Sequence, residues 1–357
     1  MNISVYIGSP TTKVPRLTPA TETQHHLLKM APQLELYDKS KSSYLLKFIG
    51  FLQTSFFTLS YLGIPFYLIS GTFVFLQHGP MTSFPWLYNL PIIISMLLPR
   101  IHMPWFTGTI LRPMLEFFEY DFIGETSDGE ILDSIFSGKK KKVMFVCQPH
   151  GVLSFGGFCS KIAMPPKFYP MPTAVASSLL TTPILKHVIG MWNLTDASSK
   201  NLRKVFKRDG TAGCVVLYVG GIAELFRCSQ TEERLYLSKR KGFIKIALRE
   251  GVEIIPAYFF GNTSVLSVVT TGPIAALARK TGVTLTYFWG LWGLPLPRWG
   301  EKVMYVRGAP LGLPHIPEPT DEDIDKWHKV YCDEVRRIYE KYREKIPHYA
   351  NKPLIID

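Results

Sequence analysis

The sequence predicts an α/β fold in which a mixed, mostly parallel sheet is flanked by helices and preceded by an N-terminal membrane-embedded helical hairpin. Three observations support this prediction. From Phe48 to Pro99 the chain has no Asp, Glu, Lys or Arg, as expected of a segment that lies in lipid. After residue 100, short apolar runs alternate with helix-like segments, which is typical of a sheet covered by helices. Apolar residues then recur every three to four positions over Asp321–Glu344, which indicates a long amphipathic helix.

Composition and charge narrow the class of protein. Hydrophobic residues make up 46% of the 357 residues and charged residues only 19%, compared with about 25% charged residues in typical soluble domains. This excludes a disordered chain, a collagen and a coiled-coil rod. The net charge of +12 comes from scattered basic residues, so it favours an anionic membrane surface or substrate over nucleic acid. The five cysteines have no paired spacing, so we expect neither a metal site nor a disulfide framework.

The chain divides into three predicted parts. Residues 1–40 are polar and rich in Thr and Pro, so we expect a disordered N-terminal tail without a secretory signal. Residues 41–100 are the predicted membrane-embedded hairpin. Residues 101–357 are predicted to form a globular domain on the cytosolic side.

Two apolar stretches separated by a turn predict the hairpin. Phe48–Leu76 is long enough to cross a bilayer, but Gly63-Ile64-Pro65 lies in its middle, where proline removes a backbone donor and favours a kink. The second stretch, Phe84–Pro99, is shorter. Lysines precede the block and Arg100 follows it, so both ends are expected in the cytosol. We therefore predict a hairpin or re-entrant wedge; the alternative is a pair of buried core helices.

Four runs rich in β-branched and aromatic residues are predicted as buried strands of the domain: Val143–Cys147, Cys214–Val219, Val252–Phe260 and Val303–Val306. Between the second and third, Gly242–Glu250 is predicted as a helix that ends at Gly251. The last predicted helix begins with three acidic residues, which suit the positive end of a helix dipole.

The strongest candidate for chemistry follows the first predicted strand. Gln148-Pro149-His150-Gly151 begins where that strand ends, and α/β proteins place ligands at the carboxyl ends of parallel strands. Pro149 fixes the turn, and Gly151 allows a close approach of backbone or substrate. The imidazole of His150 is suited to proton transfer near neutral pH; the alternative is a structural histidine. The chain has no G-x-S-x-G, Walker A, Rossmann or H-E-x-x-H motif.

Two further motifs could join His150. Gly220-Gly221 and Glu224 follow the second predicted strand, so this carboxylate could meet the histidine and stabilise an imidazolium. The alternative is a glycine turn with a solvated glutamate. Arg240-Lys241-Gly242 begins a predicted helix, where cationic side chains and free N–H groups suit an anion. The alternative is an ordinary surface helix start.

The motifs QPHG, VGGIAEL and RKGFIKIALREGVEIIPAYFFGN, in this order, resemble the type 2 diacylglycerol acyltransferase family, which includes monoacylglycerol and wax-alcohol acyltransferases. The resemblance runs from about Phe48 to the C-terminal helix. It implies a glycerolipid-acyltransferase-like fold and an endoplasmic reticulum enzyme that moves a fatty acyl group from acyl-CoA to a lipid hydroxyl. Diacylglycerol, which yields triacylglycerol, is the expected acceptor.

The resemblance also implies partners and residue roles. Acyl-CoA, a neutral lipid and the membrane are the expected partners, with no bound cofactor and no nucleic acid; a homo-oligomer and association with lipid droplets are compatible with it. His150 is implied as the general base and Glu224 as its acidic partner. Positioning and oxyanion roles fall on the residues of the two turns: Gln148, Pro149, Gly151, Gly220 and Gly221. Contact with acyl-CoA falls on the basic helix start: Arg240, Lys241, Gly242 and Lys245.

Two residues depart from the family pattern. Gln148 stands where the family commonly has a first histidine, and its amide can form hydrogen bonds but cannot exchange a proton. Asn262 replaces the usual glutamate after Phe-Gly. Because of these departures, an inactive, membrane-anchored lipid-binding scaffold stays open as an interpretation. So do an enzyme that acylates monoacylglycerol or a fatty alcohol, and a lipid hydrolase in which His150 activates water.

Overall fold

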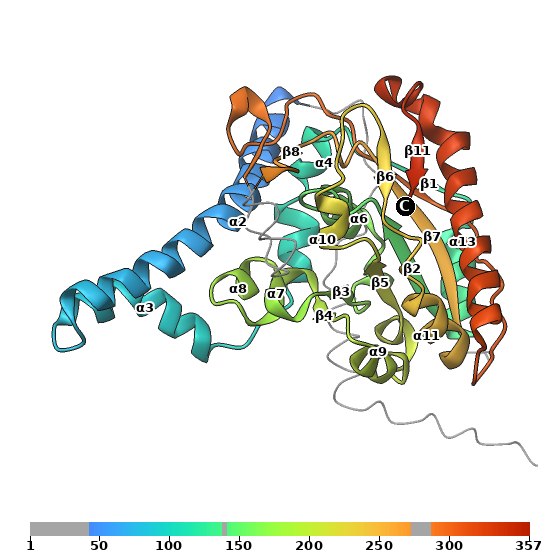
Figure 1. Ribbon diagram of the computed structural model, residues 1–357, viewed down its shortest axis with the longest axis horizontal. Helices are drawn as coiled ribbons and strands as arrows, with labels where there is room; N and C mark the ends of the chain where they lie inside the picture. The colour runs from blue at the N-terminus through green and yellow to red at the C-terminus, as the bar shows by residue number, and fades with distance from the viewer. Residues whose placement is uncertain (1–42, 138–140, 273–286) are drawn as a thin grey trace, which may run out of the picture. The chain divides into compact units, whose positions relative to one another are not determined.

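A seven-stranded sheet organises the domain (Figure 1). The computed structural model describes residues 43–137, 141–272 and 287–357, so the tail predicted for residues 1–40 lies outside the described residues. The strand order is β1-β10-β7-β2-β5-β3-β4, and every neighbouring pair is parallel except β10 and β7. The strands are β1 (Asp121–Gly124), β2 (Lys142–Gln148), β3 (Thr173–Val175), β4 (Leu194–Asp196), β5 (Val215–Tyr218), β7 (Val252–Phe260) and β10 (Met304–Arg307). The prediction of a mixed, mostly parallel sheet is confirmed.

Helices cover both faces of this sheet. Along β2, Met144 and Val146 point to one face, while Phe145 and Cys147 point to the other, as the alternation of side chains in a strand requires. The first face packs against α9 (Ser199–Phe206), α11 (Gly242–Glu250) and α13 (Asp321–Tyr342). The second lies under α4 (Pro113–Phe117), α5 (Asp128–Phe136) and α6 (Phe155–Ala163). In Figure 1, α13 and α6 lie on opposite sides of β2 and β7.

The elements predicted from local pattern form close to their expected bounds. All four predicted strands are present as β2, β5, β7 and β10. Helix α11 ends at Gly251, whose φ of 62° is left-handed, as a C-terminal glycine allows. Helix α13 begins at a capping box formed by Thr320 and Asp323. A small parallel pair, β6 (Glu233–Leu235) with β11 (Leu354–Ile356), carries the C-terminus back beside the main domain.

The predicted hairpin is a pair of helices, α2 (Tyr44–His78) and α3 (Ser83–Leu97). Helix α2 continues without interruption from its first to its last residue, with Pro65 inside it; the kink expected at Gly63-Ile64-Pro65 stays a prediction. The two helices meet through polar groups: Asn89 donates a hydrogen bond to the Gly71 carbonyl (3.2 Å), and Ser70 and Tyr88 bond through their hydroxyls (2.8 Å). A side chain at Gly71 would collide with Asn89, so glycine there permits this close approach.

The first half of α2 is docked on the domain. Gly50 lies against the backbone of Pro113 in α4, where a Cβ atom would come within 2.1 Å of the Pro113 carbonyl oxygen. Phe57 is buried against Phe158 and Trp192. By length and composition, α2 is apolar and long enough to cross a membrane, which suggests membrane association.

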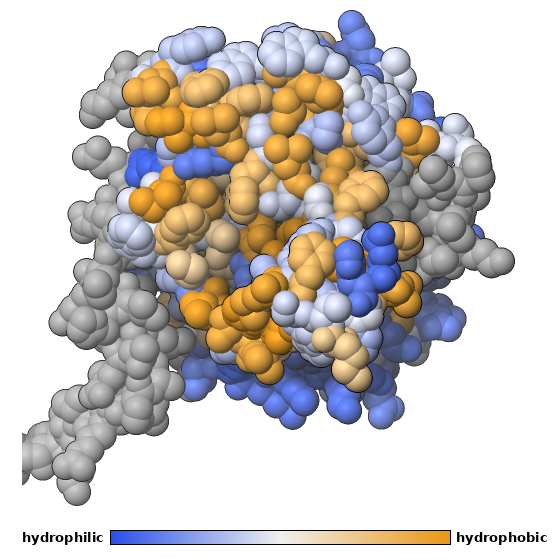
Figure 2. Space-filling view, turned by 90° about the vertical axis from the view of Figure 1, so that its left-hand side faces the viewer, coloured by the Kyte–Doolittle hydropathy of each residue, from blue (hydrophilic) through white to orange (hydrophobic). Residues whose placement is uncertain are grey.

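An apolar stripe runs along the exposed side of the hairpin. On α2 it consists of Leu45, Phe48, Leu52, Phe56, Leu59, Phe66, Ile69, Phe73 and Leu76. On α3 and the segment after it, Leu90, Ile94, Leu97 and Ile101 continue the exposed apolar surface. Figure 2 shows apolar side chains gathered over much of this side of the molecule, with hydrophilic residues toward its lower margin. Such extended apolar exposure marks an interaction surface.

Candidate active site

His150 lies at the carboxyl end of β2, near the middle of the sheet. Its chain turns at the cis Gln148-Pro149 bond and at Gly151, whose φ is 67°. The His150 ring nitrogen Nδ1 lies 2.9 Å from the Gly151 carbonyl oxygen. Because a carbonyl oxygen only accepts hydrogen bonds, Nδ1 carries the hydrogen and Nε2 keeps a lone pair. Burial lowers the pKa of His150 below its ordinary value of 6.5, so the ring is neutral at neutral pH.

The structure brings Glu224 to this turn, as expected for two motifs that each follow a buried strand. Glu224 lies on α10 (Ile222–Leu225), and its Oε2 accepts a hydrogen bond from the backbone N–H of His150 at 2.9 Å. The contact is therefore with the main chain of His150, while the imidazole is oriented by the Gly151 carbonyl. Glu224 is only 2% exposed, and this burial raises its pKa to about 7, against the opposing effect of the His150 N–H bond.

The glycine pair before α10 makes room for this carboxylate. A Cβ atom on Gly220 would lie 1.8 to 2.2 Å from the Glu224 carboxyl atoms. Gly221 has a φ of 55° and a ψ of −145°, a backbone conformation that is essentially restricted to glycine. Both glycines are thus required by the geometry of the turn.

Asn262 binds the histidine turn on its other side. Its amide nitrogen donates hydrogen bonds to the carbonyl oxygens of Pro149 (3.2 Å) and His150 (2.8 Å). Its amide oxygen accepts from the backbone N–H of Gly156 at 3.0 Å. The glutamate that the resemblance leads us to expect at this position could not donate to the two carbonyls, so these bonds depend on the amide. The sequence marks Asn262 only as a departure, because all three of its partners are more than 100 residues away.

Two tyrosines complete the surroundings of the turn. The Tyr331 hydroxyl, from α13, donates a hydrogen bond to the Oε1 atom of Gln148, which is fully buried. Gln148 therefore links β2 to α13 through a buried hydrogen bond. The ring of Tyr218, at the end of β5, meets the imidazole of His150 edge-on with centroids 5.6 Å apart. The sequence marks Tyr331 only as part of the apolar face of its helix and gives Tyr218 no role. Tyr218 is the last residue of β5 and lies two residues before the Gly220-Gly221 pair, a position that points to the site.

The basic residues at the start of α11 lie next to this site, but not all of them are available to bind a ligand. Arg240 is exposed, its guanidinium lies 5.2 Å from the ring centre of Tyr236, and its charge acts to lower the pKa of Glu224. Lys241 instead forms an ion pair with Asp325 of α13. Gly242 is the first residue of α11, and Lys245 is exposed one turn further on.

Fold and site together define an α/β protein with a histidine-centred site at the carboxyl end of a parallel strand and an apolar hairpin docked beside its sheet. The sequence profile of the family "Diacylglycerol acyltransferase" matches residues 134–357, which is more than half of the chain. The chain belongs to this family and is an acyltransferase.

Two relatives that are similar in sequence agree with this assignment. The chain is 28% identical to Diacylglycerol O-acyltransferase 2-like protein 6 of Homo sapiens, over 57% of this chain and 67% of that protein. It is 29% identical to Acyl-CoA wax alcohol acyltransferase 2 of Mus musculus, over 60% of this chain and 70% of that protein. Among solved structures, the 1-acyl-sn-glycerophosphate acyltransferase of Thermotoga maritima superposes with a TM-score of 0.40 at 15% identity, covering 83% of this chain and 95% of that one.

Proposed function

We propose that this acyltransferase moves a fatty acyl group from acyl-CoA to the free hydroxyl of diacylglycerol, forming triacylglycerol, with His150 as general base. The observation that carries the proposal is the state of the imidazole. Nδ1 is held by the Gly151 carbonyl, and the pKa is lowered by burial. The ring therefore has a free Nε2 lone pair and is neutral at the pH of the cytosol, as a general base must be.

The proposed reaction needs no covalent acyl-enzyme. Nε2 of His150 takes the proton of the acceptor hydroxyl while the oxygen attacks the thioester carbonyl carbon. The carbon–sulfur bond then breaks, and the imidazolium returns the proton to the departing thiolate. Backbone N–H groups of Gly151 and of the Gly220-Gly221 turn are the candidates for stabilising the negative oxygen. The His150 N–H is not among them, since it is bonded to Glu224.

Glu224 and Asn262 support this base from two sides. The Glu224 carboxylate holds the backbone of His150 and, when ionised, places a negative charge beside the imidazolium that forms during the reaction. The Asn262 amide holds the carbonyls of the same turn. For acyl-CoA, exposed Arg240 is the favoured contact and Lys245 a second, whereas Lys241 must first leave Asp325.

The hairpin fits insertion into one leaflet of the membrane. The first half of α2 is docked on the domain, and the end of α3 is bonded to it through Ser95, so the part that extends away is Pro65–His78 with most of α3. At 1.5 Å per residue these segments are roughly 21 and 22 Å long, short of the ~30 Å hydrocarbon core of a bilayer. A wedge of this kind is compatible with the endoplasmic reticulum membrane implied by the family resemblance, with both ends in the cytosol, and with a lipid-droplet monolayer. Glycosylation tags placed before α2 and after α3 test this, since modification of either would contradict the topology.

A fatty alcohol is a second candidate acceptor, because the name of the mouse relative states that it acts on wax alcohols. A fatty alcohol or monoacylglycerol uses the same hydroxyl chemistry, so the proposed roles of His150 and Glu224 would be unchanged. A scaffold and a hydrolase differ from both in chemistry, and the same experiment separates them.

The test uses membranes from cells that lack neutral-lipid synthesis and express the full chain. They receive labelled oleoyl-CoA with diacylglycerol, monoacylglycerol or a fatty alcohol. His150→Ala is compared with His315→Ala, since His315 is exposed and bonds only the end of α11 among the contacts described. We expect labelled triacylglycerol from the wild type and the control, and a loss of roughly 10²–10⁴-fold in His150→Ala.

Each remaining outcome has a clear meaning. Labelled wax ester or diacylglycerol as the main product would keep the mechanism and change the acceptor. Free fatty acid in place of an ester would favour the hydrolase. Full activity in His150→Ala would refute the general base, and no product from a folded wild-type protein would favour the scaffold.

A further inference from the structure

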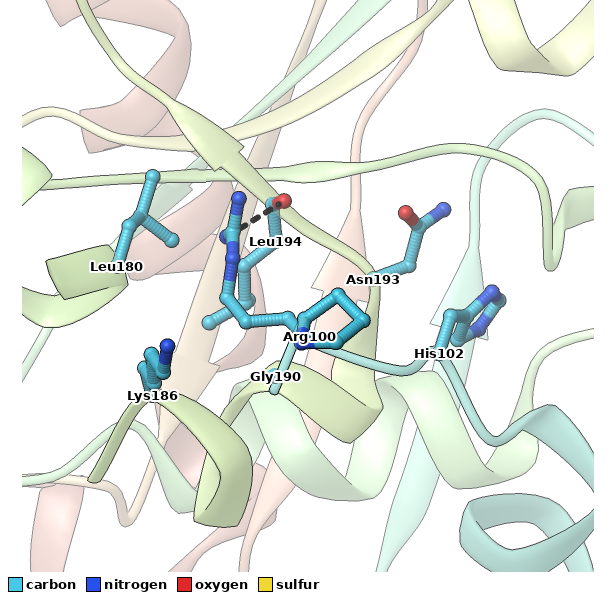
Figure 3. Close-up of a pocket in the computed structure, with 8 residues that line it drawn as sticks. Arg100, His102, Leu180, Lys186, Gly190, Asn193 and Leu194 are labelled. Atoms are coloured by element: carbon cyan, nitrogen blue, oxygen red, sulfur yellow. Dashed lines mark hydrogen bonds between the residues drawn. The ribbon is translucent and has the colours of Figure 1, made fainter. Parts of the chain in front are cut away.

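A second site lies at the base of the hairpin. A pocket of about 410 Å³ is lined by the segment that leaves α3, by α7 (Ser177–Thr181) and α8 (Leu185–Val188), and by the start of β4: Pro99, Arg100, His102, Leu180, Lys186, Gly190, Asn193 and Leu194. Figure 3 shows the Arg100 side chain running between Lys186 and Leu180 on one side and His102 and Asn193 on the other. The pocket uses none of the residues assigned to acyl transfer.

Cationic side chains dominate this lining. Arg100 and Lys186 contribute two positive charges, and none of the eight lining residues is acidic. Burial and the positive charge of Lys161 lower the pKa of His102 to about 4, so His102 is neutral at pH 7 and can both donate and accept a hydrogen bond. The electrostatic field in the pocket therefore favours an anion.

Both cations are positioned by the fold and keep donors to spare. Lys186 donates to the carbonyls of Leu98 (3.0 Å) and Met96 (3.5 Å) at the end of α3. Arg100 donates to the Leu194 carbonyl (3.4 Å), and its aliphatic stem lies over Gly190, where a Cβ atom would come within 3.4 to 3.7 Å. An arginine has five N–H donors and a lysine three, so donors of both side chains remain for a bound oxyanion.

Apolar surface adjoins this basic pocket. Leu97, Leu98 and Ile101 lie within three residues of Arg100 in the chain and are 79%, 53% and 64% exposed. A ligand whose phosphate binds Arg100 and Lys186 could therefore lay hydrocarbon chains along the end of the hairpin. This combination of one anionic group and long apolar chains is the chemistry of a membrane phospholipid.

The pocket is remote from His150. Leu194, on β4, is level across the sheet with Phe145 of β2, five residues before the histidine. Three strand spacings of about 4.8 Å and five residues of about 3.3 Å separate the two sites by roughly 20 Å.

We propose that this pocket binds the phosphate of an anionic membrane phospholipid through Arg100 and Lys186, with the lipid chains along the exposed end of the hairpin. The bound lipid would hold the base of the hairpin at the headgroup level of the membrane. A free phosphate-bearing molecule such as coenzyme A offers the same anionic group without the chains, and the test separates the two sources.

The test measures lipid retention by native mass spectrometry of the full chain in detergent micelles, with added dioleoyl phosphatidic acid or dioleoyl phosphatidylcholine. We expect the wild type to retain phosphatidic acid in preference. The double variant Arg100→Gln/Lys186→Gln is expected to bind it at least about tenfold more weakly, because charge-assisted hydrogen bonds are roughly twice as strong as neutral ones. The control Lys200→Gln/Lys204→Gln removes two exposed lysines from α9 and is expected to bind as the wild type does.

A charge-conserving variant guards against misfolding. Arg100→Lys/Lys186→Arg is expected to keep most of the binding, and circular dichroism checks the folding of each variant. Unchanged phosphatidic acid binding in the folded glutamine variant would overturn the proposal. So would displacement of the lipid by equimolar coenzyme A, because that result would assign the pocket to the free phosphate ligand.

Discussion

At the scale of the single residue, Glu224 has two properties with opposite effects on its ionisation. Its carboxylate accepts the backbone N–H of His150, yet it is almost fully buried, and its pKa is raised to about 7. A group whose pKa is raised on folding contributes stability below its unfolded pKa and loses that contribution as the pH rises through the folded one. Ionised Glu224 would assist an imidazolium, but its ionisation also lowers the stability of the folded protein.

The raised pKa predicts how the stability of Glu224→Gln depends on pH. Between about pH 4.5 and pH 7 the wild type should lose roughly 3 kcal/mol of stability, at 1.36 kcal/mol per pKa unit, and the variant should not. We expect a higher melting temperature than the wild type at pH 8, an equal one at pH 4.5, and lower transferase activity. Thermal unfolding across this pH range is the measurement, with the exposed Glu318→Gln as control. If the melting temperatures of the wild type and Glu224→Gln depended on pH in the same way, the raised pKa of Glu224 would be contradicted.

Asn262 gives a second prediction at this scale. Asn262→Asp keeps the shape but removes both donors to Pro149 and His150, and it points a charge at two carbonyl oxygens. We expect a loss of at least about 2 kcal/mol of stability together with a fall in kcat of the folded fraction.

Asn201→Asp is the matched control for that experiment. Asn201 also donates two hydrogen bonds, to the Thr195 hydroxyl and the Asp196 carbonyl, but it lies on α9. Its aspartate variant should lose stability without changing kcat of the folded fraction. An Asn262→Asp enzyme with wild-type kcat would show that the Asn262 hydrogen bonds do not position His150.

At the scale of the element, two tight turns at the ends of β2 and β5 define the site. The turn after β5 depends on Gly220, because a methyl group there would overlap the Glu224 carboxylate. The turn after β2 is held by groups from α10 and from the end of β7. The position of the His150 turn therefore depends both on the glycine geometry of the neighbouring turn and on hydrogen bonds from residues far away in the chain.

Gly220→Ala tests the turn as an element. The methyl group should displace Glu224, leave the His150 N–H without its partner and lower kcat/KM by about 10²-fold, a typical cost of misplacing a catalytic group by about an ångström. Gly129→Ala in α5 is the control, since its Cβ atom would have only one ordinary contact, at 3.9 Å. Initial rates with purified protein measure the effect. Equal kcat/KM values for the two variants would show that the Glu224 position is not needed.

At the scale of the whole molecule, a buried ion pair ties the C-terminal segment to the core. Lys352 lies 2.5 Å from Glu233, and their side chains are 2% and 0% exposed. Glu233 also accepts hydrogen bonds from Tyr258 and Tyr349. Its bond from Thr263 places this network one residue from Asn262. Segments that are more than 100 residues apart in the chain thus meet next to the residue that holds the His150 turn.

Lys352→Met should therefore be severely destabilising. It would leave the Glu233 carboxylate buried without its cation, a cost of about 3–5 kcal/mol. The double variant Glu233→Gln/Lys352→Met should recover part of that loss, because no unpaired charge remains. The exposed pair Asp333–Arg336 on α13 is the control, and Arg336→Met should cost at most about 1 kcal/mol. Denaturant unfolding in detergent measures all three, and equal losses in the two single variants would contradict the role of the buried pair.

The sequence by itself determined the local elements and marked His150 as the candidate base. Runs of β-branched and aromatic residues predicted β2, β5, β7 and β10, and apolar residues at every third to fourth position predicted α13. The position of His150 after a buried strand marked the candidate site. These features are readable because strand and helix periodicity depend on neighbouring residues only.

Only the tertiary structure decided the partners. It placed the Glu224 carboxylate on the backbone of His150, 74 residues away, and the Asn262 amide on the carbonyl of the same histidine, 112 residues away. It also docked α2 on α4 at Gly50, before Pro65, and packed it against α3 at Gly71, after Pro65. Hydrogen-bond partners of this kind follow from the order in which strands pair, and no local pattern in the sequence encodes that order.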